Sequence, residues 1–433
     1  MAAAALSAGS ALKGFSAPVD RVAGANERLR LGVIGVNSRG NALACGFAKM
    51  KEAEIAYVCD CDLNALARCQ NELSKITGHT PAGEQDIRKL LEHQDLDAVV
   101  IATPDHWHAP AAIMAMAAGK HVYLEKPTSH SPSENELLIR ATAKYKRVVQ
   151  AGNQRRSWPN VREGIELLKA GEIGKVQFAK AWYVNNRPSI GHGKPAPVPE
   201  GLDWDLWQGP APRQEFHDNY IHYNWHWFWN WGTGEALNNG THFVDILRWG
   251  LGVDYPAMVS SIGGRYRYDD DWETPDTQLI SFQFGDEAAC SWEGRSCNSV
   301  PCDGAGLGVS FYGEKGSMVF SGGNEFKVLD LKGNLVRTQS GGLKFDYGNL
   351  VNPCEELDQL HFQNWIDGIK RGAPLNSEIT EACISTHLVQ LGNISQRVGR
   401  SLKVDPSNGH ILGDAKAEKL YGRKYEKGWE PKV

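Results

Sequence analysis

Residues 31–40 read Leu-Gly-Val-Ile-Gly-Val-Asn-Ser-Arg-Gly, an apolar strand that runs into a glycine-rich turn. An acidic residue, Asp60, follows twenty positions after Gly40. This spacing is typical of a dinucleotide-binding βαβ unit, in which backbone N–H groups at the start of a helix hold a pyrophosphate. A carboxylate at the end of the next strand accepts hydrogen bonds from a ribose 2′-OH and would repel a 2′-phosphate. The predicted cofactor is therefore NAD.

The turn departs from the usual G-x-G-x-x-G pattern, because Asn37 stands where the second glycine is expected. Asparagine tolerates left-handed backbone better than most residues, so we expect the turn to be retained. Taken alone, the loop would also fit an ordinary strand-to-helix turn. The turn residues that we assign to the cofactor are Gly35, Asn37, Ser38 and Arg39.

Two aspartates compete for the ribose contact. Asp62 directly precedes residues 63–77, a predicted helix that Gly78 ends, so Asp62 is predicted to be the N-cap of that helix. We therefore assign the ribose contact to Asp60.

The bulk composition is that of a globular protein with more than one domain. The chain has 433 residues, of which 42% are hydrophobic and 22% charged, and its net charge is −5. These values predict no nucleic-acid partner and no membrane-surface partner, and no apolar run reaches the roughly 18 residues of a membrane span. The nine cysteines lack paired C-x-x-C spacing, so no metal site is predicted.

The first 25 residues differ in composition from the rest of the chain. They are rich in Ala, Ser and Gly, and Ala23-Gly24-Ala25 resembles a small-residue cleavage site. An export signal that has lost its positive start, or a disordered tail, would explain this segment. The first interpretation predicts a periplasmic or exported protein, and the second a cytoplasmic one.

The pattern of the chain changes after Gly152. Before it, strand-like runs alternate with amphipathic stretches, which predicts a parallel sheet. The runs are Leu31–Ile34, Glu54–Val58, Ala98–Ala102, His121–Leu124 and Val148–Gln150. Later runs at Val176–Val184, Met258–Tyr268 and Val309–Phe320, with alternation around Ile280, predict an open antiparallel sheet with helices on one face.

These patterns predict an α/β protein with an N-terminal Rossmann domain and a following α+β domain with a mostly antiparallel sheet. The predicted boundaries are 1–28 for the N-terminal tail, 29–152 for the NAD-binding domain, 153–405 for the substrate-binding and oligomerisation domain, and 406–433 for a C-terminal tail. The uncovered face of the second sheet needs a partner, which predicts a homo-oligomer, either a dimer or a tetramer.

Polar residues follow two of the predicted parallel strands, where ligands of such sheets bind. One group is Thr103-Pro104-Asp105-His106-Trp107-His108, and the other is Glu125-Lys126-Pro127. Lys126, held between an acid and a proline, could bind a substrate hydroxyl or shuttle its proton, although a solvated lysine is the commoner case. The His106-x-His108 pair has no third ligand nearby, which argues against a metal. We assign to the cofactor Thr103, Pro104, Asp105, His108, Glu125 and Lys126.

Several motifs resemble the Gfo/Idh/MocA family, named for glucose-fructose oxidoreductase and inositol dehydrogenase. They are Gly-Lys-His-Val-Tyr-Leu-Glu-Lys-Pro at 119–127, Thr103-Pro104 with His108, Gly152-x-x-Arg155-Arg156 and Gly-Glu-Ile-Gly-Lys-Val at 171–176. The resemblance runs from about residue 29 to 400. It implies a Rossmann domain, an α/β domain with an open sheet, and NAD(P)-linked oxidation or reduction of sugars and polyols.

The resemblance also implies a catalytic cluster made of the lysine of Glu-Lys-Pro and an Asp-x-x-x-His pair. Here these positions are Lys126, His242 and Asn238, which replaces the aspartate. His242 is suited to accept a hydroxyl proton, and the Lys126 ammonium to stabilise a developing alkoxide. The resemblance extends the cofactor contacts to Asn153 and the substrate contacts to Arg155, Arg156, Asn238, Thr241 and His242.

A tryptophan-rich stretch between these motifs offers walls for a sugar pocket. Trp207 and His226 are our choice of wall residues, although large aromatics also fill domain and subunit interfaces.

The leading hypothesis is an NAD-dependent oxidoreductase that moves hydride between a sugar, glycoside or cyclitol carbon and nicotinamide. A second hypothesis is an NAD-dependent glycosidase that acts by transient oxidation and elimination. That branch typically has Tyr-Pro-Thr-His where residues 239–242 read Asn-Gly-Thr-His. A third hypothesis is a sensor that binds sugar and dinucleotide without turnover, because fold does not dictate function.

Overall fold

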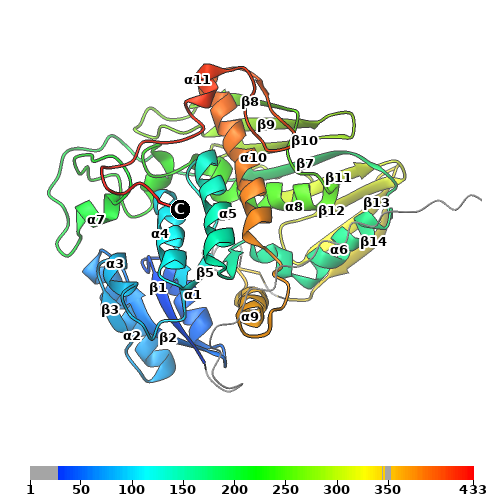
Figure 1. Cartoon of the computed structure of the whole chain (residues 1–433). Coiled ribbons are helices and arrows are strands. Elements are labelled where there is room, and N and C mark those ends of the chain that lie inside the picture. The colour runs from blue at the N-terminus through cyan, green and yellow to red at the C-terminus, as the bar shows by residue number, and fades with distance from the viewer. Residues whose placement is uncertain (1–27, 344, 347–352) are drawn as a thin grey trace, which may run out of the picture.

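Two sheets organise the chain, which the computed structural model describes over residues 28–343, 345–346 and 353–433 (Figure 1). The predicted export segment lies outside these residues. The first sheet is parallel throughout, with the order β3-β2-β1-β4-β5-β6. Its strands are β1 (Leu29–Ile34), β2 (Ala53–Cys59), β3 (Ala82–Glu84), β4 (Ala98–Ile101), β5 (His121–Leu124) and β6 (Val149–Ala151). The predicted parallel sheet is confirmed, and its strand order is that of the dinucleotide-binding fold.

Local sequence signals set most helix ends in this domain. Its helices are α1 (Arg39–Ala48), α2 (Leu63–Thr77), α3 (Ile87–Leu90), α4 (Asp105–Ala117) and α5 (Pro132–Tyr145). The Asp62 carboxylate accepts the N–H of Asn64, which confirms it as the N-cap of α2. Ser131 and Glu134 form a capping box at the start of α5.

Helix α4 begins at Asp105, five residues before Pro110, although proline is common at the first helical position and the sequence therefore predicts a start at Pro110. That expectation was wrong, because residues 105–109 contain no helix breaker and Pro104 already takes the N-cap position. Pro110 has no N–H to donate to the carbonyl of His106. The Nη2 of Arg423 donates to that carbonyl instead, at 2.5 Å.

The second sheet has the order β14-β13-β12-β11-β7-β10-β9-β8-β15. Its pairs are antiparallel except β7 with β10, which are parallel, so the predicted open and mostly antiparallel sheet is confirmed. The strands are β7 (Val176–Val184), β8 (Met258–Gly264), β9 (Thr277–Phe284), β10 (Ala288–Arg295), β11 (Leu307–Gly313), β12 (Gly316–Phe320), β13 (Glu325–Asp330), β14 (Leu335–Ser340) and β15 (Leu402–Lys403). The run expected at 309–320 is therefore two strands.

One face of this sheet is covered by helices α6 (Pro159–Lys169), α8 (Thr241–Leu251) and α10 (Ile379–Val398), as Figure 1 shows. The helices cover this face because its side chains are apolar. On strand β9, Ile280, Phe282 and Phe284 face these helices and are buried. Leu279 on the same strand points the other way and is exposed.

Helix α9 (Glu355–Arg371) packs on the first sheet, although it comes late in the chain. Its residues Phe362 and Trp365 contact Phe47 of α1 and Tyr123 of β5. The apolar core of the cofactor domain is thus completed by a segment from beyond the second sheet.

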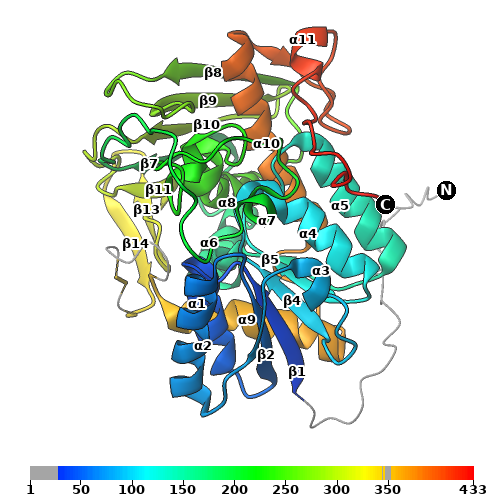
Figure 2. The ribbon, with the colours of Figure 1, turned by 90° about the vertical axis from the view of Figure 1, so that its left-hand side faces the viewer.

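The last part of the chain returns to the first domain, and both views place the C-terminus beside α4 and α5 (Figures 1 and 2). The indole of Trp429 lies edge-on to that of Trp107, with ring centroids 5.1 Å apart. Arg423 pairs with Glu134 at 2.8 Å, and the N–H of Glu426 donates to the carbonyl of Pro210. These contacts join α4 and α5 to the loop after α7 (Trp204–Gln208). Within the described residues, no helix has the length and apolarity to cross a membrane.

Buried histidines make stability sensitive to acid. Burial lowers the pKa of His106 and His387 to about 3 and that of His361 to about 4. An unfolded histidine takes up a proton below about pH 6.5, so between that pH and 4 the unfolded chain binds more protons. The stabilisation is complete above pH 6.5 and is lost as the pH falls, by on the order of 2 kcal/mol per histidine at pH 5.

Replacing His387 by Leu removes one of the histidines that take up a proton only on unfolding. The Nε2 of His387 is buried and has no hydrogen-bond partner among the residues that the structure describes. We expect urea unfolding between pH 7 and pH 5 to show a smaller loss of stability for His387→Leu than for the parent. An unchanged loss would contradict a neutral buried His387.

Candidate active site

A cavity of about 310 Å³ opens beyond the carboxyl ends of β1, β2, β4 and β5 and is closed on its other side by residues of the second domain. It brings together most of the residues that the sequence singled out. Those that line it are Gly35, Asn37, Ser38, Arg39, Asp60, Thr103, Pro104, Asp105, His108, Glu125, Lys126, Arg155, Trp207, His226, Asn238 and His242.

Three predicted residues do not line this cavity. Arg156 is buried and forms a two-point ion pair with Asp245, at 2.7 and 2.8 Å. The Thr241 hydroxyl donates to the carbonyl of Leu237, and Asn153 is buried in the turn after β6. The doublet Arg155-Arg156 thus sends one guanidinium to the cavity and the other to an ion pair.

The glycine turn leaves space that any side chain would fill. Gly35 has a φ of +80°, and a Cβ there would lie 2.8 Å from the carbonyl oxygen of Ala102. A Cβ on Gly40 would lie 1.8 Å from the carbonyl oxygen of Gly35. Helix α1 starts directly after this turn, so its first N–H groups are directed toward the cavity.

Asp60 fixes the turn to the end of β2. Its Oδ2 accepts the N–H of Val36 at 2.7 Å, and its Oδ1 accepts the N–H of Asp62 at 3.0 Å. Each carboxylate oxygen keeps a second lone pair for a ribose hydroxyl. Burial raises the pKa of Asp60. The Thr103 hydroxyl is buried and has no hydrogen-bond partner in the described part of the chain. An unsatisfied polar atom and the cradle at Gly35 both fit a bound dinucleotide.

Asp60→Ala is expected to weaken NAD binding about tenfold to a hundredfold, because a hydrogen bond to a charged group contributes about 1.5–3 kcal/mol. The matched control is Asp62→Ala, which removes a helix cap and costs stability, about 1 kcal/mol, while leaving NAD affinity unchanged. Calorimetric titration with NAD and with NADP measures the coenzyme affinity of both variants, and urea unfolding measures the stability of Asp62→Ala. Parent-like NAD affinity in Asp60→Ala would contradict the assignment.

Glu125 is held in an ion cluster at the cavity floor. Its Oε1 pairs with the Nε of Arg39 at 2.9 Å, and the Nη1 of Arg39 pairs with Asp358 of α9 at 3.0 Å. These carboxylates raise the pKa of Arg39 although its burial acts in the opposite direction. Asp358 could not be predicted as part of this cluster, because its helix lies far along the chain. Arg39 and Glu125 therefore border the cofactor site as a fixed pair.

Lys126 contacts the second domain. Its Nζ donates to the carbonyl of Asn238 at 2.6 Å and lies 3.4 Å from the Oδ1 of the same residue. Burial lowers the pKa of Lys126, and the Glu125 and Asp105 carboxylates offset part of that effect. The ammonium thus releases its proton more readily than an exposed lysine would.

Asn238 and His242 lie on consecutive turns, the first of which is not α-helical, although their four-residue spacing predicts one face of a single α-helix. Residues Ala236–Gly240 form a π-helical turn, and His242 is the second residue of α8. Burial lowers the pKa of His242 well below its usual value, and the positive charges of Arg155 and Lys126 lower it further. The imidazole is therefore neutral near pH 7 and can accept a hydrogen bond.

The far wall of the cavity contains polar residues that the sequence analysis did not select. They include Tyr183, Arg187, Tyr223 and Asn239. Arg187 pairs with the buried Glu235 at 2.5 Å and donates to the Tyr223 hydroxyl at 2.9 Å. Glu235 also accepts from Asn239 and Ser296. The only signal in the sequence was position, since Tyr183 lies at the end of the predicted strand 176–184 and Arg187 three residues beyond that strand.

The predicted aromatic walls combine packing with access to the cavity. Trp207 is buried against Trp204 and Trp231, and its carbonyl accepts from His106 and from the indole of Trp107. The Nδ1–H of His226 donates to the carbonyl of Tyr223 at 2.6 Å, which leaves Nε2 as an acceptor.

His108, which lies in α4 just after strand β4, is held by backbone groups. Both ring nitrogens of His108 face carbonyl oxygens, those of Pro127 and Thr103. Within residues 28–343, 345–346 and 353–433, no group of three or more His, Cys, Asp or Glu side chains is placed to hold a metal ion.

The fold and the cavity together define a two-domain protein with a dinucleotide-binding site between a Rossmann domain and an α/β domain. The chain belongs to the Gfo/Idh/MocA oxidoreductase family. The model described as "Oxidoreductase family, NAD-binding Rossmann fold" matches residues 29–153, and that described as "Oxidoreductase family, C-terminal alpha/beta domain" matches residues 202–404. The predicted family and the predicted cofactor, NAD, are thereby confirmed.

Curated relatives match only part of their length. A glycosyl hydrolase family 109 protein of Saccharopolyspora erythraea is 32% identical over 167 residues, which are 37% of this chain and 36% of that protein. A second protein of that name from Shewanella sp. (strain ANA-3) is 38% identical over 112 residues, 25% of each chain.

Solved structures match over most of both chains. Levoglucosan dehydrogenase in complex with NADH and levoglucosan has a TM-score of 0.67 at 18% identity, over 90% of this chain and 100% of that one. The WlbA dehydrogenase of Bordetella pertussis, in complex with NADH and UDP-GlcNAcA, has a TM-score of 0.64 at 18% identity, over 88% and 99% of the two chains. At these identities the likeness establishes the fold.

Proposed function

We propose that the protein transfers hydride between NAD and a hydroxyl-bearing carbon of a sugar, glycoside or cyclitol. The observation that carries this proposal is that Lys126 and His242, from different domains, line the same cavity as Asp60 and the glycine turn. NAD, when bound, supplies the hydride acceptor or donor.

Lys126 and His242 manage the proton of the reacting hydroxyl. The neutral imidazole of His242 accepts this proton, and the Lys126 ammonium stabilises the negative charge that develops on the oxygen. The same positive charges that lower the pKa of His242 also favour an alkoxide over a neutral hydroxyl. Asn238 anchors Lys126 through its backbone carbonyl. Its side-chain amide makes long contacts, with Lys126 at 3.4 Å and with Glu235 at 3.5 Å, so it remains able to contact a sugar hydroxyl.

A carbohydrate panel tests this proposal. Purified full-length protein with NAD and a set of sugars, glycosides and cyclitols is expected to produce NADH absorbance at 340 nm with at least one compound, at a rate that rises with enzyme concentration. The proposal fails if NAD binds and no compound of a broad panel yields NADH.

A second candidate is an NAD-dependent glycosidase, favoured by the curated relatives named for glycosyl hydrolase family 109. In this case a sugar is oxidised transiently, the glycosidic bond breaks by elimination and the hydride returns. Release of aglycone without net NADH, with solvent deuterium appearing at the sugar C2, would identify this activity. Net NADH with an intact glycosidic bond would exclude it.

We also propose self-association and export. Apolar side chains remain exposed on the uncovered face of the second sheet, among them Phe178, Met258 and Leu279. Light scattering is expected to give a dimer or tetramer that Leu279→Lys weakens, and a monomeric parent would refute this.

Export is tested by mass spectrometry of the N-terminus. Cleavage after Ala25 in the periplasmic fraction is expected, and an intact cytoplasmic N-terminus would refute export.

A further inference from the structure

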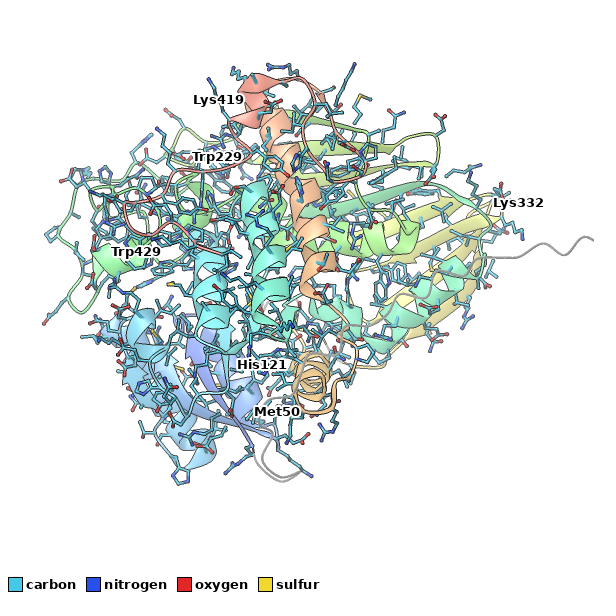
Figure 3. All side chains as sticks on the ribbon, viewed as in Figure 1. Met50, His121, Trp229, Lys332, Lys419 and Trp429 are labelled. Carbon is cyan, nitrogen blue, oxygen red and sulfur yellow. The ribbon has the colours of Figure 1, made fainter. Side chains whose placement is uncertain are left out.

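A second cavity, of about 580 Å³, lies apart from the candidate active site and shares no lining residue with it. It is bounded by the start of α5, the last turns of α10, the segment 229–233 and residues 419–424 of the C-terminal segment. Figure 3 labels Trp229 and Lys419, which lie on the same side of the molecule near the end of α10. Its size is within the usual range for small-molecule sites.

The charged side chains that line this second cavity are all cationic. They are Arg397, Lys419, Arg423 and Lys424, and no carboxylate is among the lining residues, although the chain as a whole has a net charge of −5. The Arg397 guanidinium lies 4.8 Å from the centre of the Trp229 ring. It has no hydrogen bond or ion pair with any described residue. Two carboxylates lie behind these four cations: Glu134 pairs with Arg423, and Glu273 accepts the N–H of Trp229 and attracts Arg397. The lining of the concave site therefore keeps a net positive charge.

Arg423 presents a donor that the protein leaves unused. Its side chain is 8% exposed, its Nε pairs with Glu134 at 2.8 Å and its Nη2 donates to the carbonyl of His106. Its Nη1 is buried and finds no hydrogen-bond partner among the residues described. A buried donor left unsatisfied is unfavourable, and two fixed nitrogens hold this one in place. Such a preorganised guanidinium suits a phosphate or carboxylate oxygen.

We propose that this second cavity binds a small organic anion through a phosphate or carboxylate group. Arg397 contacts the anionic oxygens, and Arg423, Lys419 and Lys424 add positive charge around them. The cavity is larger than an inorganic phosphate needs, so the rest of the ligand occupies the space beside Trp229. This site is independent of the proposed hydride transfer.

Isothermal titration of the full chain tests the site, with NAD present at saturation so that the dinucleotide site cannot bind the probe. The probes are glucose 6-phosphate, glucuronate and inorganic phosphate at constant ionic strength. We expect one of the two sugar anions to bind more tightly than inorganic phosphate. The sugar that binds shows whether a phosphate or a carboxylate is preferred.

Arg397→Gln is expected to weaken that binding at least about tenfold, as loss of a charge-assisted hydrogen bond does, and Lys424→Gln by less. The matched control is Arg400→Gln, one turn further on, because Arg400 pairs with Asp414 at 2.6 Å and does not line the cavity. The proposal is overturned if no sugar anion binds at about 10 mM, if inorganic phosphate binds as tightly as the sugars, or if Arg400→Gln weakens binding as much as Arg397→Gln.

Discussion

Lys126→Met is expected to lower kcat about a hundredfold to a thousandfold with any sugar that reduces NAD, while the affinity for NAD changes by less than about threefold. The variant keeps most of the aliphatic stem and removes the ammonium that the proposed mechanism places beside the reacting oxygen. Loss of one preorganised donor to a developing oxyanion has an effect of this size. Steady-state kinetics and calorimetric NAD titration measure the two quantities separately.

Lys120 provides the matched control, because it lies just before the same strand, β5, at the opposite end. Its Nζ donates to the carbonyls of His93 and Leu96, both at 2.8 Å, far from the cavity lining. Lys120→Met is expected to lose stability and keep its kcat. If Lys126→Met retained more than about a tenth of the parent kcat, the lysine would have no part in the chemistry.

Arg156→Met is expected to destabilise the protein by about 3–5 kcal/mol, since it leaves a buried carboxylate without its counter-charge. Asp245 accepts from Arg156 at two points and from the Ser385 hydroxyl at 2.7 Å, and all three side chains are buried. This network connects η1 (Gln154–Ser157), α8 and α10. Urea unfolding at pH 7 measures the loss.

Comparison with the adjacent residue, Arg155, distinguishes a structural role of Arg156 from a role in substrate binding. Arg155 lines the cavity, so Arg155→Met is expected to change the kinetics with the sugar and to leave unfolding nearly unchanged. A substrate role for Arg156 would give the reverse result: unfolding within about 1 kcal/mol of the parent and a raised KM.

Features set by neighbouring residues could be predicted from the sequence. The strands of the first sheet, the N-cap Asp62 and the capping box at Ser131 each depend on a pattern only a few residues long. The cofactor turn and Lys126 were accessible for the same reason, because parallel strands bring their carboxyl ends to one edge.

Features that depend on contacts between distant residues could not be predicted from the sequence. Strand β3 is only three residues long and carries no apolar pattern. The Arg156–Asp245 pair joins residues 89 positions apart, and a guanidinium next to another in sequence gives no sign of which one is buried. Glu235 and Arg187 were missed because a buried ion pair reads, in sequence, as two ordinary surface charges.

The C-terminal segment bears on how the cofactor enters and leaves. Residues 405–433 follow the region that the family models match, and they bridge α4 of one half to the Pro210 loop of the other. A hinge that swung the halves apart would have to break either the contacts of Trp429 and Arg423 with α4 or the Glu426–Pro210 hydrogen bond. The C-terminal segment therefore resists separation of the two halves around the cavity in which the coenzyme binds.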